Sequence, residues 1–300
     1  MQDALDVLLT EGINPSTAQI DALDTLSLVQ AINDQDALVA QAVRAELPAI
    51  AQAVDGIVAC LKRGGHLVYV GAGTSGRLGV LDASECPPTF GVSPGLVRGI
   101  IAGGDRALRA SVERAEDDPD AGADAVVQEN VGGADVVVGI AASGRTPFVL
   151  GAVREARKRG ALTVGIACNR PSELEAQVDV MIAPLVGSEV ISGSTRMKAG
   201  TAQKMVLNML STATMIRLGK TYGNLMVDLK ATNAKLRVRA RRLVVQACGI
   251  DADLAEAVLS RCDYEVKTAI VMVKVGLDAA AARARLDACD GFIRRVFEQV

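Results

Sequence analysis

The sequence predicts an α/β fold in which a mainly parallel β-sheet is covered by helices on both faces. Short runs rich in Val and Ile alternate with helical stretches over residues 63–183, and such alternation is typical of a doubly wound sheet. The runs are continuously apolar, as expected for parallel strands buried on both faces. The chain has 300 residues, of which 50% are hydrophobic, enough for one large domain and a small one.

Three regions are predicted along the chain. Residues 1–62 show apolar periodicity with polar breaks and are expected to form an N-terminal helical arm. Residues 63–245 carry the alternating pattern and form the main domain. Residues 249–300 contain short Ala-rich stretches preceded by Asp251 and Asp278, which are preferred N-cap residues, and are expected to form a small all-helical domain.

The elements of the main domain follow in order. The expected strands span residues 66–70, 96–102, 135–141, 162–167 and 178–183. The expected helices span residues 106–116, 147–158 and about 195–218, with a weaker one at 172–177.

Composition argues against several classes of protein. The net charge is −3 and the aromatic residues are four Phe, three Tyr and no Trp, whereas nucleic-acid binders need a basic surface and often stacking platforms. No apolar run approaches the ~18 residues of a membrane span, and no signal peptide is expected. The six scattered cysteines are expected to be reduced thiols of a cytoplasmic protein. A single histidine argues against a His-rich metal site, so no metal is expected.

The loop after the first expected strand spans residues 71–77, with the sequence GAGTSGR. Glycines let the backbone turn tightly beside a ligand. Thr74 and Ser75 stand where a helix begins, a position that favours anions. The GxGxxG spacing that ends at Gly76 also fits a dinucleotide fingerprint, but the acid expected ~20 residues later is missing, since Leu96 stands there. An NAD-binding enzyme is therefore a weak alternative.

A second loop of similar composition follows the third expected strand and contains Ser143, Gly144 and Thr146. Ligands of open α/β sheets bind outside the carboxyl ends of the strands, so the two loops can converge on one phosphorylated sugar. The alternative is that the hydroxyls only cap the helices that follow. A third segment, residues 187–198, offers Glu189, Ser194 and Thr195 and fits a substrate-lining loop and a capping cluster equally well.

Two glutamates stand out beside these loops. Glu85 is expected to end a short helix and to be held near the first loop, because the residue before a proline is disfavoured in the α region and Pro87 and Pro88 follow. Glu116 is expected to close the helix 106–116 and is followed by further acids, an arrangement that opposes the helix dipole. A solvated surface carboxylate remains the alternative for each.

Long motifs of this chain closely resemble the N-acetylmuramic acid 6-phosphate etherases, bacterial enzymes of the sugar-isomerase (SIS) fold. Two positions depart from the family pattern, since Gln35 and Ser27 stand where acids are expected. The resembling segments are residues 10–16, 32–34, 71–91, 115–118, 140–147, 187–204, 223–228 and 267–272.

The resemblance implies a lyase that cleaves the D-lactyl ether of N-acetylmuramic acid 6-phosphate by elimination and then hydration. The products are N-acetylglucosamine 6-phosphate and D-lactate, the location is the cytoplasm, and neither cofactor nor metal is implied. Glu85 is implied to be the acid that protonates lactate, and Glu116 the base at carbon 2. The resemblance also implies amino sugar catabolism, including peptidoglycan recycling.

A homodimer with its site near the subunit interface is implied as well, and the C-terminal domain resembles a ubiquitin-associated helical domain. No nucleic acid or membrane partner is expected. The candidate substrate contacts are Thr74, Ser75, Gly76, Ser143, Gly144, Thr146, Glu189, Ser194 and Thr195.

Two other functions fit the same fold. A sugar-phosphate-binding regulator would share the hydroxyl-rich loops but need not keep both glutamates. A phosphosugar isomerase also moves a proton at carbon 2, and several isomerases of this fold open the sugar ring with a histidine. His66 stands at the start of the first expected strand, far from the loops at its other end, and is expected to be structural.

Overall fold

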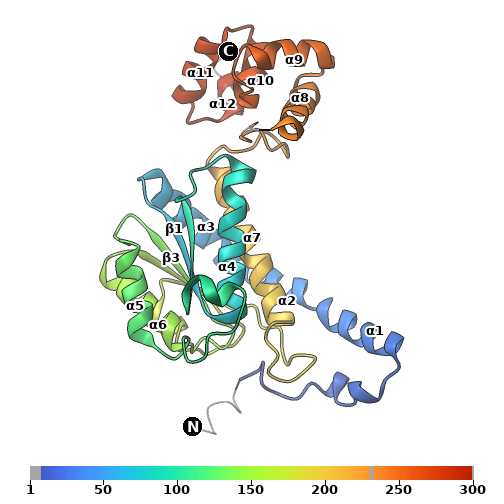
Figure 1. The fold of residues 1–300 in the computed structure, drawn as a ribbon, viewed down its shortest axis with the longest axis vertical. Helices are drawn as coiled ribbons and strands as arrows, with labels where there is room; N and C mark the ends of the chain where they lie inside the picture. Colours follow the sequence, from blue (N-terminus) through green and yellow to red (C-terminus); the bar gives the residue numbers. More distant parts are fainter. Residues whose placement is uncertain (1–7, 230, 232, 299–300) are drawn as a thin grey trace. The chain divides into compact units, whose positions relative to one another are not determined.

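The computed structural model describes residues 8–229, 231 and 233–298, which divide into two compact units (Figure 1). The sheet unit comprises the described residues of Met1–Ser84 together with Gly95–Ser211. The helical unit comprises Glu85–Pro94 and the described residues of Thr212–Val300. Helices α4 (Gly73–Phe90) and α7 (Lys198–Arg217) contribute residues to both units.

The sheet is parallel throughout, with the strand order β2-β1-β3-β4-β5. All the predicted strands are confirmed to within two residues at either end. The order reverses between β1 and β3, and this switch point is where ligands bind in open α/β sheets. The strands are β1 (Leu67–Gly71), β2 (Val97–Ile101), β3 (Val136–Ile140), β4 (Leu162–Ile166) and β5 (Val180–Ile182).

Helices cover both faces of the sheet, which confirms the predicted fold class. On one face Val68 and Val70 of β1 pack in a buried cluster with Phe148 of α6 (Pro147–Lys158). On the other face Tyr69 meets α4, where a Cβ on Gly79 would lie 3.0 Å from that of Tyr69. Successive residues of β1 therefore pack on opposite faces of the sheet, as the pleat of a β-strand requires.

The N-terminal part of the sheet unit is helical, as predicted. Two 3₁₀ turns, Pro15–Thr17 and Ile20–Ala22, lead into α1 (Thr25–Asp36), which buries none of its residues. Helix α2 (Val39–Ala45) follows, and α3 (Leu47–Lys62) turns an apolar face with Ile57 and Val58 into the core. Asp24 is the N-cap residue of α1, and its side chain accepts hydrogen bonds from the backbone N–H groups of Leu26 and Ser27.

Two local predictions are wrong. Residues 106–116 do not form a helix, since a 3₁₀ turn (Gly104–Leu108) is followed by irregular chain in which Arg114 has a φ of 61°. The acids after Glu116 begin a helix instead of ending one: Asp118 caps α5 (Pro119–Gln128) by accepting from Asp120 and Ala121. Acids at a helix N-terminus are favourable.

The helix that carries Glu85 also does not stop there. Helix α4 continues through Pro87 and Pro88 to Phe90. A proline lacks the N–H group needed within a helix, yet the last turn accommodates both, and Gly91 N donates to Pro87 O at 3.0 Å. Likewise the expected helix at 172–177 is a 3₁₀ turn at Glu175–Gln177, and α7 begins at Lys198.

The helical unit has its own apolar core. Helix α10 (Val266–Val275) lies within it, packed with α8 (Ala234–Cys248), α9 (Ala252–Ser260), α11 (Ala279–Ala288) and α12 (Ile293–Glu298). The predicted caps are confirmed, because Asp251 accepts from Leu254 N and Asp278 accepts from Ala281 N, both at 2.8 Å. Over the described residues, no helix is long and apolar enough to cross a membrane.

Candidate active site

Two of the hydroxyl-rich loops meet at the switch point of the sheet. The first leads from β1 into α4, and the second, residues 141–146, leads from β3 into α6. Because β1 and β3 are hydrogen-bonded neighbours that run in the same direction, their carboxyl ends open at the same edge. The sequence therefore places two helix N-termini side by side, and both favour an anion.

A cavity of about 440 Å³ lies at this edge. Its hydroxyl groups come from all three predicted loops, and its charged groups are three acids and one arginine. The hydroxyl residues are Thr74, Ser75, Ser143, Thr146 and Thr195. The charged residues are Glu11, Glu116, Asp117 and Arg145. The cavity thus combines donors for a phosphate or a sugar with carboxylates able to move protons.

The hydroxyl groups that line the cavity differ in their hydrogen bonds. Ser75 is buried, and its Oγ donates to Oε1 of Gln203 on α7 at 2.9 Å. Ser143 Oγ accepts a 3.2 Å hydrogen bond from Arg145 N and so shapes the second loop. Thr146 stands at the N-cap of α6 without a side-chain cap bond. The capping alternative therefore does not account for Thr146, whose hydroxyl lines the cavity.

Close backbone packing of α5 against α6 fixes the position of Glu116. A Cβ on Gly151 would lie 1.9 Å from Pro119 O, and one on Gly122 would lie 1.9 Å from Phe148 O, so only glycine permits this approach. The chain just before α5 is thereby drawn to the start of α6, where Phe148 N donates to Glu116 O at 3.0 Å. The Glu116 side chain is exposed and lines the cavity.

Glu85 does not share the cavity with Glu116. It is exposed on α4, ten residues after Ser75, which corresponds to about 15 Å along a helix axis. The lining residues from the described part of the chain do not include Glu85. The expectation that Glu85 is held beside the first loop is wrong for a single chain, because the continuous helix α4 puts about three turns between Ser75 and Glu85.

The third loop contributes to the cavity only through Thr195. Glu189 is fully buried, and its two carboxylate oxygens accept from the backbone N–H groups of Lys198 and Ala199, both at 2.9 Å. It therefore caps α7. Burial lowers the pKa of the Lys198 side chain, against the opposing attraction of Glu189 and Asp36.

The two glycines among the predicted substrate contacts, Gly76 and Gly144, shape the backbone of their loops. A Cβ on Gly76 would lie 2.8 Å from Gly71 O, so this glycine lets α4 start against β1. Gly144 has a φ of 69°, and its loop passes Ser172 closely. Neither glycine is among the described lining residues, and the same holds for Ser194.

His66 lies at the opposite end of β1 from the cavity. Its Nδ1 and its backbone N–H contact Asp135 Oδ1 at 2.9 and 2.7 Å. Burial works against ionisation of Asp135, but hydrogen bonds from Gly132 and His66 hold the pKa of this carboxyl below its usual value. The interaction joins the starts of β1 and β3, so the histidine has the structural position expected for it.

Among the residues of the cavity and its wall, four with a charged or amide side chain were not predicted as site residues: Glu11, Asp117, Arg145 and Gln203. All four lie within segments that carry the family resemblance, which was the available signal. The contact of Gln203 with Ser75 could not be found from local sequence, because it spans 128 positions.

Comparisons with known proteins agree with this geometry. Residues 49–157 match the family described as the glucokinase regulatory protein N-terminal SIS domain, and residues 119–213 match the SIS domain family. Phosphoheptose isomerases from Francisella tularensis and Neisseria gonorrhoeae share the fold, each with a TM-score of 0.50, at 20% and 18% identity. They cover 63% and 64% of this chain, and 100% and 98% of their own.

Full-length relatives are much more similar. An N-acetylmuramic acid 6-phosphate etherase from Caldanaerobacter subterraneus is 57% identical over 289 residues, which cover 96% of this chain and 94% of the relative. The etherase of Salmonella typhimurium is 57% identical over 294 residues, which cover 98% and 99%. At this identity over nearly the whole chain, the protein belongs to the family of N-acetylmuramic acid 6-phosphate etherases.

Proposed function

We propose that this protein cleaves the D-lactyl ether of N-acetylmuramic acid 6-phosphate, giving N-acetylglucosamine 6-phosphate and D-lactate. The observation that carries the proposal is the identity of 57% to etherases over nearly the full chain. The cavity supports it, because hydroxyl groups and two helix N-termini suit a phosphorylated sugar, and Glu116 supplies a carboxylate beside them.

The proposed chemistry starts from the open-chain form of the sugar, in which the aldehyde makes the hydrogen on carbon 2 acidic. The Glu116 carboxylate removes this proton, the bond between carbon 3 and the ether oxygen breaks, and Glu85 protonates the departing lactate. Water then adds at carbon 3 and a proton returns to carbon 2. This series of reaction steps needs one carboxylate and one carboxylic acid in the same site.

The phosphate fixes the sugar relative to these groups. We assign it to the donors at the starts of α4 and α6, with Thr74, Ser75, Ser143, Thr146 and Thr195 as contacts. Positioned hydrogen bonds of this kind hold the reacting carbon near the base without taking part in the chemistry.

A homodimer completes the proposed site. Glu85 is exposed and does not line the cavity that holds Glu116, and in the proposed dimer a second copy brings its Glu85 to this cavity. We place the dimer in the cytoplasm, in amino sugar catabolism that includes the recycling of peptidoglycan. The six cysteines, five of them buried, suit a reducing compartment.

One incubation tests the reaction. The protein is mixed with N-acetylmuramic acid 6-phosphate in oxygen-18 water, and both products are read by mass spectrometry. Release of lactate with the label on carbon 3 of the sugar is expected. Label in lactate would mean displacement at the lactyl carbon and would overturn the mechanism. Bound but unchanged substrate would point to a regulator, and isomerised substrate to an isomerase.

A further inference from the structure

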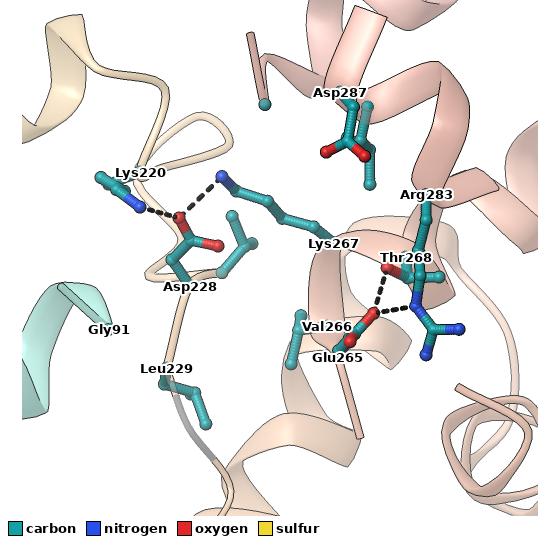
Figure 2. A pocket seen from close by; sticks show the side chains of 13 residues that line it. Gly91, Lys220, Asp228, Leu229, Glu265, Val266, Lys267, Thr268, Arg283 and Asp287 are labelled. Atoms are coloured by element: carbon teal, nitrogen blue, oxygen red, sulfur yellow. Dashed lines mark hydrogen bonds and ion pairs between the residues drawn. The ribbon is translucent and has the colours of Figure 1, made fainter. Parts of the chain in front are cut away.

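The helical unit contains a second cavity, of about 420 Å³ (Figure 2). It opens between the segment that follows α7 and the helices α10 and α11. Its apolar wall is formed by Val227, Leu229, Val266 and Leu286. Six charged side chains surround it: Lys220, Asp228, Glu265, Lys267, Arg283 and Asp287.

One end of this cavity has an excess of positive charge. Asp228 Oδ2 accepts a hydrogen bond of 2.7 Å from Lys267 Nζ and lies 3.0 Å from Lys220 Nζ. Figure 2 shows the two lysines approaching this one carboxylate from either side. A single negative charge is therefore shared by two ammonium groups, whose side chains are only 12% (Lys267) and 27% (Lys220) exposed.

The shared carboxylate does not fully compensate Lys267. Burial lowers the pKa of this lysine, the attraction of Asp228 opposes the shift, and the neighbouring Lys220 adds to it. A second anion in contact with the two ammonium groups would restore the balance of charge, because buried charges need both pairing and hydrogen bonds.

The other end has an excess of negative charge. Glu265 Oε2 accepts from Arg283 Nε at 2.8 Å and from Thr268 Oγ1 at 2.7 Å. Arg283 also pairs with Asp263 at 3.0 Å, so one cation is divided between two carboxylates. Within the described part of the chain, Asp287 has no side-chain hydrogen bond or ion pair, and it lines the same cavity.

The proposed reaction assigns no role to the residues that line the second cavity. Asp228 and Lys267 stand in two of the motifs that first pointed to the family, residues 223–228 and 267–272. The lining residues all belong to the helical unit, whereas the hydroxyl-rich cavity belongs to the sheet unit. The opposite charges at the two ends of the second cavity indicate which kind of molecule it can bind.

We propose that this second cavity binds a small zwitterion. Its phosphate or carboxylate contacts Lys220 and Lys267 beside Asp228, and its ammonium group faces Asp287 and Glu265. Charge-assisted hydrogen bonds at both ends give specificity, and the apolar wall covers the carbon atoms between them. An amino sugar phosphate and an α-amino acid both have this chemistry.

Calorimetric titration of the full chain with phosphoethanolamine tests the proposal. This probe carries a phosphate and an ammonium group, while ethyl phosphate carries only the anion and ethanolamine only the cation. We expect phosphoethanolamine to bind at least about tenfold more tightly than either single-charge probe. Equal binding of ethyl phosphate, or no binding of phosphoethanolamine, would overturn the zwitterion proposal.

Variants decide which cavity takes the probe. Lys220→Met and Asp287→Asn should each weaken the binding of phosphoethanolamine by about tenfold. The substitutions Lys62→Met and Asp253→Asn, at exposed residues that do not line this cavity, should leave it unchanged. Asp287→Asn is an exposed, near-isosteric change, so it should fold even if the loss of Lys220 does not permit folding. Binding that survives both variants but is lost in Thr146→Val would assign the probe to the hydroxyl-rich cavity and refute the proposal.

A last comparison separates the two sources of ligand. Glucosamine 6-phosphate and lysine are titrated against the wild type and Asp287→Asn. The ligand whose affinity falls in the variant is the kind that the cavity takes. If neither responds to the substitution, the ion pairs only fasten the segment after α7 to the helical unit, and the proposal fails.

Discussion

The Ser75 hydroxyl donates a 2.9 Å hydrogen bond to Oε1 of Gln203, and this bond joins the first turn of α4 to α7 beneath the hydroxyl-rich cavity. Both side chains are buried. The Nε2 of Gln203 is also buried and has no hydrogen-bond partner among the described residues. Gln203 therefore holds Ser75 in one rotamer although half of its amide group is unsatisfied.

We predict that Gln203→Leu weakens substrate binding more than stability. The substitution removes a hydrogen bond worth about 1 kcal/mol but also removes an unsatisfied donor of similar cost, so the free energy of unfolding changes little. Without its partner Ser75 is free to rotate, and KM should rise by about tenfold. Urea unfolding and steady-state kinetics measure the two effects. In a cycle with Ser75→Ala, fully additive changes in KM would contradict the proposed coupling.

A second prediction concerns the contact of α5 with α6. In Gly151→Ala the new Cβ would lie 1.9 Å from Pro119 O, so the helices must separate, at a cost of about 2–3 kcal/mol. The separation also displaces Glu116, so kcat should fall in the protein that remains folded. Gly132→Ala is the matched control, because a Cβ there meets nothing within 4 Å. Equal thermal stability of the two variants would show that the close contact is not needed.

The strands could be predicted from sequence because each is a short Val- and Ile-rich run with no competing periodicity. The arrangement of the site residues was harder to predict from the sequence. Sequence placed Ser75 and Thr146 at strand ends, and the register of β1 with β3 then brought them together. The end of α4 was mispredicted, because the rule that prolines stop helices is local, whereas α4 keeps its last turn through Pro87 and Pro88. The helix expected over 106–116 is replaced by a 3₁₀ turn (Gly104–Leu108) and irregular chain with a positive φ at Arg114, a backbone conformation that the residue pattern does not reveal.

A third prediction uses the half-buried Asp82, which accepts hydrogen bonds from the hydroxyls of Tyr69 at 2.9 Å and Ser211 at 3.1 Å. Burial raises the pKa of this carboxyl above 3.8, although both hydroxyls and Lys204 oppose the shift. The folded protein therefore keeps the proton at pH values where the unfolded chain has released it. For such a group, stability is greatest below the unfolded pKa and falls as pH rises through the folded one.

Urea midpoints of the wild type and Asp82→Asn, measured from about pH 4 to about pH 7, test this prediction. Relative to the variant, the wild type should lose stability as pH increases from 4 and level off above the raised pKa. The exposed substitution Asp55→Asn serves as the control and should follow the wild type. Parallel curves for the wild type and Asp82→Asn would mean that burial does not perturb this carboxyl.

The last prediction asks whether two copies share one site. Glu85→Gln and Glu116→Gln should each lower lactate release by at least about 10²-fold without unfolding the protein, because each removes a proton-transfer group. If Glu85 acts in the cavity of the partner, a mixed dimer of the two variants has one site with both glutamates intact. Random pairing into symmetric dimers then restores about a quarter of the wild-type rate. The measurement is lactate release after the differently tagged variants are expressed together. A mixture as inactive as its components, with mixed dimers recovered by both tags, would place Glu85 and Glu116 of one chain in the same site.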